Sequence, residues 1–157
     1  MQESEVIRLY DLYSDSIYRL AYSYLGSMHD AEDIVQDIFL KLVQRNIRIG
    51  EGKEKSYLMS MAANACKDLF RSGRMKLTVP FEEVADRAFD YSLEEQDISL
   101  FEALKKLPEN YRAVIHLHYF EGYKVKEISK ILRISQSGVT MRLTRGRDML
   151  ADLLKEE

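Results

Sequence analysis

The stretch "EISKILRISQSGVTMRL", residues 127–143, holds two short apolar patterns separated by a turn. Ile128 and Leu132 are four residues apart, and this spacing predicts one buried stripe on a first short helix. Ser135 is a good N-cap for a second helix that begins at Gln136, because its hydroxyl can accept a backbone N–H. The triplet "RIS" between the two patterns predicts a tight turn. The stretch is therefore expected to fold as a helix-turn-helix.

The second helix of this motif has a polar and basic outward face. Its predicted buried stripe consists of Val139, Leu143 and Leu150. At about 100° per residue, the side chains that point away are Ser137, Met141, Thr144 and Arg145, flanked by Gln136, Thr140 and Arg142. Short polar side chains suit base-edge contacts and arginines suit phosphates, so this face favours DNA binding.

A plain helical hairpin with a solvated basic face is the alternative interpretation of the same stretch. Arg133 supports it, since this arginine stands in the turn where helix-turn-helix proteins usually have glycine. The left-handed backbone conformation usual there costs a non-glycine residue some free energy without prohibiting it. We favour DNA binding over this alternative.

The composition predicts an all-α protein. Only two prolines and seven glycines occur in 157 residues, and Val-Thr alternation is rare. Gly26 and Gly122 are expected C-caps, Asp30 an N-cap with Asp33 three residues later, and Pro108 the first residue of a helix. The expected helices before the motif are 4–25, about 30–45, 56–72, one that restarts near Ser92, and 109–121.

The charge distribution divides the chain further. The net charge of −3 combines −2 in residues 1–72, −4 in residues 73–100 and +3 in residues 101–157. We expect an all-α fold of two small helical domains joined by a flexible, acidic linker, with the bounds 1–74, 75–91 and 92–157. Long-range attraction of the free chain to DNA should be weak, so DNA binding is expected to need a partner that supplies positive surface.

The stretch "DIVQDIFLKL", residues 33–42, predicts an amphipathic helix with one misfit. Ile34, Ile38 and Leu42 recur at the spacing of a buried stripe. Leu40 falls on the opposite face among acidic and amide side chains. A lone exposed leucine is common on protein surfaces, but an apolar side chain with a polar rim also has the character of a docking anchor.

Three stretches together resemble a known family. "AEDIVQDIFLKL", "YLMSMAANACKDLFR" and the run from "LPENYRAVIHLHYF" to "RGRDML" are similar, in order and spacing, to extracytoplasmic-function (ECF) sigma factors of the sigma-70 family. The resemblance implies a subunit that binds core RNA polymerase and directs promoter-specific initiation. It implies a region 2 domain at 1–74 that binds the polymerase and opens the −10 element, and a region 4 domain at 92–157 that reads the −35 element.

The resemblance also implies three sets of contact residues. Core polymerase would contact Asp33, Gln36, Asp37 and Leu40. The −10 strand would contact Asn64, Lys67, Arg71 and Arg74. The −35 duplex would contact Ser137, Thr140, Met141, Arg142 and Arg145. Helical geometry independently predicts an outward face of Ser60, Ala63, Asn64, Lys67 and Arg71, whose cations and amide suit a phosphate backbone and a base edge.

Two departures from the family pattern concern DNA contacts. Tyr57 stands where the family usually has tryptophan, so packing or strand contact there is altered. Thr140 replaces a common lysine, which removes one cation from the recognition helix. Promoter preference is therefore not carried over from the family.

No catalytic residue, metal or cofactor is expected. His116 and His118 are two residues apart on a predicted helix, point about 200° apart and cannot chelate together. Cys66 lies on an apolar stripe and is interpreted as a core residue. No glycine-rich phosphate loop or close acid pair indicates an active site.

The expected partners are core RNA polymerase (its β′ clamp helices and β flap), promoter DNA and, by resemblance, an anti-sigma factor that acts in a stress response. The absence of a signal peptide and of a long apolar segment predicts a cytoplasmic protein without direct membrane insertion, which an anti-sigma factor could hold at the membrane. The alternative function is a stand-alone helix-turn-helix transcription regulator with an N-terminal interaction domain. Such a regulator would bind a duplex operator without polymerase, as a dimer.

Overall fold

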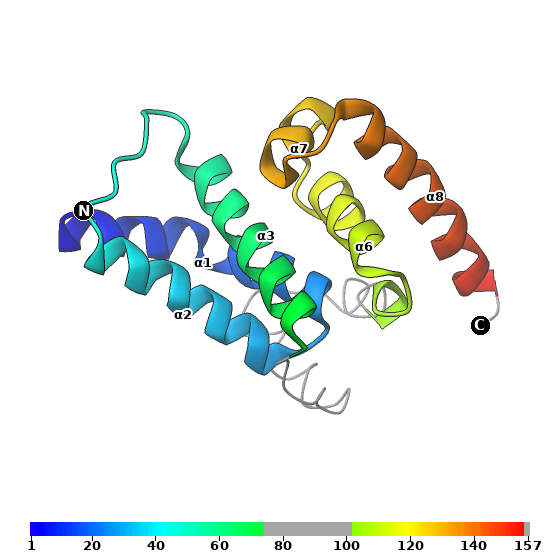
Figure 1. The fold of residues 1–157 in the computed structure, drawn as a ribbon, viewed down its shortest axis with the longest axis horizontal. Coiled ribbons are helices and arrows are strands. Elements are labelled where there is room, and N and C mark those ends of the chain that lie inside the picture. The colour runs from blue at the N-terminus through cyan, green and yellow to red at the C-terminus, as the bar shows by residue number, and fades with distance from the viewer. Residues whose placement is uncertain (74–101, 156–157) are drawn as a thin grey trace.

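The computed structural model describes residues 1–73 and 102–155, and every regular element within them is a helix (Figure 1). The first half consists of α1 (Glu3–Leu25), α2 (Met28–Gln44) and α3 (Glu54–Ser72). The second half consists of α6 (Glu109–Ile115), the π-helix η1 (His116–Phe120), α7 (Val125–Leu132) and α8 (Gln136–Lys155). The all-α class is confirmed. The expectations for Arg74, the linker 75–91 and the helix near Ser92 lie outside the described residues.

Helix α1 supplies much of the core of the first half. Its apolar stripe, from Ile17 through Leu20 to Leu25, is buried against α2 and α3. Gly26 ends the helix with a left-handed φ of 71°, a conformation that glycine adopts without steric cost. The long amphipathic helix and its glycine cap agree with the sequence.

The start of α2 differs from the expectation. Ser27, directly after the glycine, is the N-cap, and its Oγ accepts a hydrogen bond from the Asp30 backbone N at 3.3 Å. Gly26 reverses the chain so abruptly that the next residue already has the extended backbone of a cap. Asp30 therefore lies inside the first turn of α2, where a carboxylate interacts favourably with the helix dipole.

The second half begins with a helix that changes its winding. Pro108 is the N-cap of α6, not its first residue as expected, because its ψ of 147° is extended. After Ile115 the chain widens into η1, in which the Glu121 backbone N donates to the His116 carbonyl, five residues earlier, at 3.2 Å. Glu121 is the C-cap of this segment, and Gly122, the expected C-cap, follows it with φ 73°. The expected helix 109–121 is thus α-helical in its first half and a π-helix in its second.

The helix-turn-helix forms as predicted at its turn. Arg133 adopts the left-handed conformation with φ 58° and ψ 46°, and Ser135 Oγ accepts from the Gly138 backbone N at 3.0 Å. The apolar pairing on α7 is partly wrong: Ile128 and Ile131 are buried, whereas Leu132 is only half-buried. The motif therefore has the predicted caps, but the buried face of α7 is rotated slightly about the helix axis from the predicted one.

Helix α8 crosses α6 at a position without a side chain. Val139 and Leu143 are buried along the crossing. At Gly146 a Cβ would lie 3.1 Å from Ile115 Cγ1, closer than ordinary van der Waals contact. The glycine therefore allows the two backbones to approach closely, and the rest of α8 extends beyond the crossing (Figure 1).

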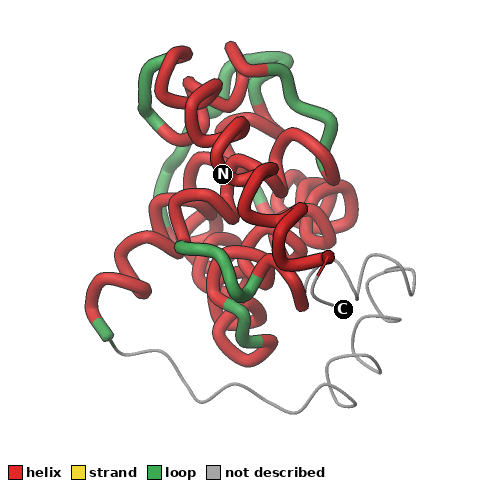
Figure 2. The backbone as a smooth tube through the Cα atoms, turned by 90° about the vertical axis from the view of Figure 1, so that its right-hand side faces the viewer, coloured by secondary structure: helices red, strands yellow, loops and turns green. Residues whose placement is uncertain are grey.

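The two halves contact each other along a surface that we call the domain seam. On one side of it lie α1 and α3, and on the other lie α6, η1 and α7. Figure 1 shows α7 beside the N-terminal part of α3, and Figure 2 shows the same assembly from its side. The seam was not predicted from the sequence.

Candidate functional site

The outward face of α2 carries the proposed docking residues. Gln36, Asp37 and Leu40 are exposed on one face, and Asp33 is half-buried at its edge. The Leu40 side chain is 52% exposed, while the opposite stripe around Ile38 is buried. Sequence reasoning missed Val43, which is 55% exposed one turn further along α2 and enlarges the apolar part of this surface. Its i+3 spacing from Leu40 was the available signal.

The predicted −10 face of α3 is covered in part by the second half of the chain. Asn64 and Lys67 are half-buried, Arg71 is exposed, and Arg74 lies outside the described residues. Ala63, expected on the outward face, is only 3% exposed, so that expectation was wrong. The reason is the domain seam. Packing within the first half buries one side of α3, and contact with the second half buries another side.

A small cavity lies where this face of α3 meets the helix-turn-helix. Its volume is about 80 Å³, and Asn64, Lys67 and Arg71 line it from α3. Arg142 of α8 lines it from the other side. Residues predicted for the −10 and −35 elements therefore face one common cavity.

The remaining predicted −35 residues share the exposed face of α8. Ser137, Thr140, Met141 and Arg145 are exposed. Thr140 Oγ1 donates to the Gln136 carbonyl at 3.1 Å, so its hydroxyl proton is used within the helix. The hydroxyl oxygen of this exposed threonine keeps a lone pair, and its methyl group is apolar. They can accept a hydrogen bond from a base edge and contact a thymine methyl, respectively.

A buried polar cluster joins α1 to η1 across the seam. Ser23 Oγ lies 2.7 Å from His116 Nδ1, and His116 Nε2 lies 3.2 Å from Glu121 Oε1. The same carboxylate oxygen accepts from Arg19 Nε at 3.2 Å. Burial alone would raise the pKa of Glu121, but the hydrogen bonds and electrostatic interactions with His116 and Arg19 lower it to about 2. Sequence reasoning excluded a metal role for His116 but did not find this cluster.

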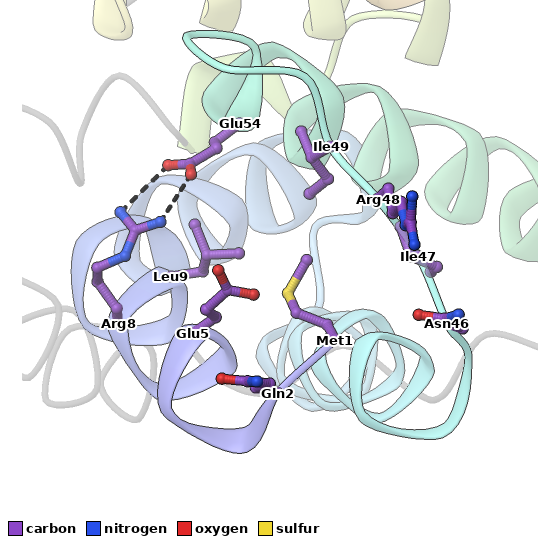
Figure 3. A pocket seen from close by; sticks show the side chains of 10 residues that line it. All are labelled: Met1, Gln2, Glu5, Arg8, Leu9, Asn46, Ile47, Arg48, Ile49 and Glu54. Atoms are coloured by element: carbon purple, nitrogen blue, oxygen red, sulfur yellow. Dashed lines mark hydrogen bonds and ion pairs between the residues drawn. The ribbon is translucent and has the colours of Figure 1, made fainter.

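A larger open cavity lies at the N-terminal end of the first half. Its volume is about 580 Å³, and it is lined by α1, the loop before α3 and the first turn of α3 (Figure 3). At its edge both guanidinium NH groups of Arg8 donate to the Glu54 carboxylate, at 2.6 and 3.2 Å. Hydrogen bonding to Arg8 lowers the pKa of Glu54. None of the predicted contact residues lines this cavity.

Residues 1–73 and 102–155 contain neither a membrane-spanning helix nor a cluster of metal-binding side chains. No helix there is long and apolar enough to cross a membrane. No three His, Cys, Asp or Glu side chains in this part of the chain are placed to hold a metal ion.

Comparison with known proteins places the two halves in one family. Residues 9–75 match the profile of Sigma-70 region 2, and residues 98–150 match that of Sigma-70, region 4. The ECF RNA polymerase sigma factor SigW of Bacillus subtilis (strain 168) is 33% identical, over 93% of this chain and 87% of that protein. SigX of the same strain is 27% identical, over 95% and 84% of the two chains.

Two solved structures have a similar fold. The sigma factor RpoE, in complex with the anti-sigma factor NepR from Bartonella quintana, superposes with a TM-score of 0.68. It is 22% identical, and the match covers 96% of this chain and 97% of that one. CnrH in complex with the cytosolic domain of CnrY gives the same TM-score and identity, over 99% and 91% of the two chains.

Proposed function

This chain belongs to the sigma-70 family, in its ECF group. On that premise we propose which of its surfaces binds core RNA polymerase and which surfaces bind promoter DNA during promoter-specific initiation. Residues 1–74 bind core RNA polymerase and open the −10 element, 75–91 form the linker, and 92–157 read the −35 element. The main support for the proposal is that the two family regions follow one another in the expected order. Each region carries polar side chains on the outward face of its predicted contact helix. The chain has no catalytic role of its own, and it needs no metal or cofactor.

The polymerase-binding surface is the outward face of α2. Leu40 is the apolar anchor, and Gln36 and Asp37 form a polar rim beside it, with Asp33 at the edge. An exposed apolar side chain ringed by polar groups has the composition of an interface centre. The β′ clamp helices are the partner proposed for this surface, and the β flap is the partner proposed for the second half.

The promoter surfaces are the outward faces of α3 and α8. Asn64, Lys67 and Arg71, with Arg74, contact the −10 strand through a base edge and phosphates. Capture of unstacked bases there makes the melted promoter relatively more stable, so binding energy supplies the opening. The −35 duplex is contacted from α8 by Ser137, Thr140, Met141, Arg142 and Arg145.

An anti-sigma factor is proposed as the regulatory partner. RpoE and CnrH, whose folds this chain shares, were each solved with a partner, and the partner of RpoE is an anti-sigma factor. We place the chain in the cytoplasm, where such a partner would sequester it until a stress signal arrives.

Transcription in vitro tests the proposal. Core polymerase with the full chain is expected to initiate from discrete start sites in a genomic DNA library, and core polymerase alone is not. Arg145→Ala should reduce initiation at those sites, whereas Arg147→Ala, an exposed arginine nearer the buried side of the same helix, should have little effect. The proposal fails if the chain neither binds core polymerase nor supports any start site. Binding to a duplex operator without polymerase would favour a stand-alone regulator instead.

A further inference from the structure

The largest net positive charge of the second half lies on the first helix of the helix-turn-helix and its turn. Residues 124–135 have a net charge of +3, whereas residues 101–123 have no net charge and residues 136–155 have +2. The +3 arises from four cations and one carboxylate: Lys124, Lys126, Lys130, Arg133 and Glu127. Glu127 Oε1 accepts from the Lys124 backbone N at 3.1 Å, so this carboxylate lies at the start of α7. The proposed function uses two arginines of α8 and gives these four cations no role.

Three of the cations form one exposed stripe along α7. Lys126, Lys130 and Arg133 are four and three residues apart, the spacing that brings side chains to one face of a helix. All three are exposed, whereas Ile128 and Ile131 on the other side of α7 are buried. In the part of the chain that the structure describes, the three side chains make no hydrogen bond or ion pair. We call these three residues the basic stripe; its charges face solvent without a compensating partner.

The turn holds Arg133 at the end of the stripe in an unfavourable backbone conformation. Its φ of 58° and ψ of 46° are left-handed, which costs a residue with a Cβ free energy that glycine avoids. Ser129 fixes this turn, because its carbonyl accepts from the Ile134 backbone N at 3.2 Å and its Oγ donates to the Ile134 carbonyl at 2.5 Å. The exposed Arg133 side chain contributes no contact that offsets the strain. Backbone strain that packing does not explain is typical of functional positions.

The basic stripe continues the proposed −35 face around the turn. Arg133 lies two residues before Ser135, the N-cap of α8, and α7 packs beside the start of α8 (Figure 1). In a helix-turn-helix the second helix enters the major groove with its N-terminal residues at the bases, while the first helix crosses the DNA backbone. A phosphate strand that borders the groove would therefore pass along α7. Lysine and arginine are the side chains that neutralise phosphates there.

We propose that Lys126, Lys130 and Arg133 form a second DNA-binding surface, which contacts phosphates of the duplex beside the −35 element and reads no bases. The inference rests on the proposed function in one respect, the assignment of the helix-turn-helix to promoter duplex. The side chains of α8 then read the sequence, and the basic stripe adds affinity that does not depend on sequence. Arginine occupies the left-handed turn because its phosphate contact is worth more to the complex than the lost stability of the free chain.

Neutral substitutions remove the charges of the stripe. Lys126→Gln and Lys130→Gln keep a long side chain with good helix propensity. Arg133→Gly removes the cation and also relieves the strain of the turn. Because Arg133→Gly should make the fold more stable, weaker DNA binding in this variant cannot result from unfolding. Lys106→Gln is the matched control, since Lys106 is an exposed lysine of the second half outside the helix-turn-helix.

The salt dependence of promoter binding tests the surface. The full chain is assembled with core polymerase, and the Kd for a promoter fragment is measured at several salt concentrations. Each phosphate contact contributes about −0.9 to the slope of log K against log salt, so the triple variant should have a slope that is shallower by about 2.7. Over a fourfold rise in salt it should lose about 40-fold less affinity than the parent chain. Lys106→Gln should keep the slope of the parent chain.

A second promoter fragment separates phosphate contacts from base contacts. When the sequence of the −35 element is altered, the effect of the triple variant should stay the same. The effect of Arg145→Ala should shrink on the altered fragment, since its base contact is already lost there.

The outcomes that would overturn the inference are distinct from failure of the proposed function. An unchanged slope in the triple variant would overturn it, as would a loss confined to fragments with the intact −35 element. An unchanged slope with weaker assembly on core polymerase would assign the stripe to an acidic protein surface instead. If the parent chain forms no promoter complex and supports no start site, the proposed function fails. A random-sequence duplex with the chain alone at low salt then decides the inference: binding that the triple variant weakens supports it, and equal binding or none refutes it.

Discussion

Truncation of Leu40 to alanine tests the docking surface on α2. Complete burial of a leucine side chain contributes about 1.5–3 kcal/mol. The Leu40 side chain is 52% exposed, so a partner that covers it can gain about half of that amount, about 0.8–1.5 kcal/mol. Loss of this contribution should weaken binding to core polymerase about 4- to 12-fold. The stability of the free chain should fall by no more than about 1.5 kcal/mol, because the part of the side chain that is already buried contributes at most about that amount.

Leu12 provides the matched control. It is 56% exposed on α1, so Leu12→Ala removes the same atoms from a comparable environment outside the proposed surface. Titration of labelled chain with core polymerase, followed by fluorescence anisotropy, gives the Kd of each variant. Urea unfolding of the two variants shows whether either substitution disturbs the fold.

The comparison between Leu40→Ala and Leu12→Ala shows whether Leu40 is a specific contact with core polymerase. Weaker binding in Leu40→Ala with unchanged binding in Leu12→Ala supports an anchor at α2. Equal losses would indicate a general effect of surface hydrophobicity. Unchanged affinity in Leu40→Ala would show that Leu40 is an ordinary exposed leucine and would refute the assignment of this face.

Three further predictions concern stability. Gly146→Val should destabilise the second half by about 1–3 kcal/mol in urea unfolding, because the added atoms would overlap Ile115; an unchanged midpoint would contradict the close crossing. Arg133→Gly should stabilise the chain by about 0.5–1 kcal/mol in thermal unfolding, since relief of the left-handed strain exceeds the extra entropy of glycine in the unfolded chain. Glu121 has a pKa near 2 when folded, so its ionised form stabilises the fold at neutral pH, and this contribution is lost as the pH falls from about 4.5 toward 2. Melting temperatures between about pH 6 and about pH 3 should therefore fall less in Glu121→Gln than in the parent chain, and equal slopes would contradict this role.

Features set by nearby residues were predictable from the sequence. The glycine end of α1, the Ser135 cap of α8 and the positive φ of Arg133 each depend on local backbone chemistry, and all three agree with the structure. The N-cap of α2 was misplaced because both Ser27 and Asp30 are good capping residues. Only the position of the turn at the preceding glycine decides between them.

Features set by contact between the two halves were not predictable. Ala63 was expected to face outward because helical periodicity reports the stripe buried in a helix's own bundle and contains no information on a second surface. The cluster around His116 was missed for the same reason, since its partners are 93 residues earlier and five residues later in the chain. The outward faces of α2 and α8 were anticipated because each depends on one helix alone.

The π-helix η1 has a consequence for the alignment of related sequences. Its backbone hydrogen bond from Glu121 N to the His116 carbonyl spans five residues where an α-helix spans four, so the segment contains an inserted residue relative to α-helical winding. Deletion of one residue between Ile115 and Gly122 would restore a continuous α-helix and rotate all that follows by about 100° about its axis. Relatives that differ by one residue here are expected to differ in the orientation of α7 and α8 relative to α6. A single-residue gap at this point would then record a change of angle between α6 and the helix-turn-helix, with no change in the residues that form the surface of either.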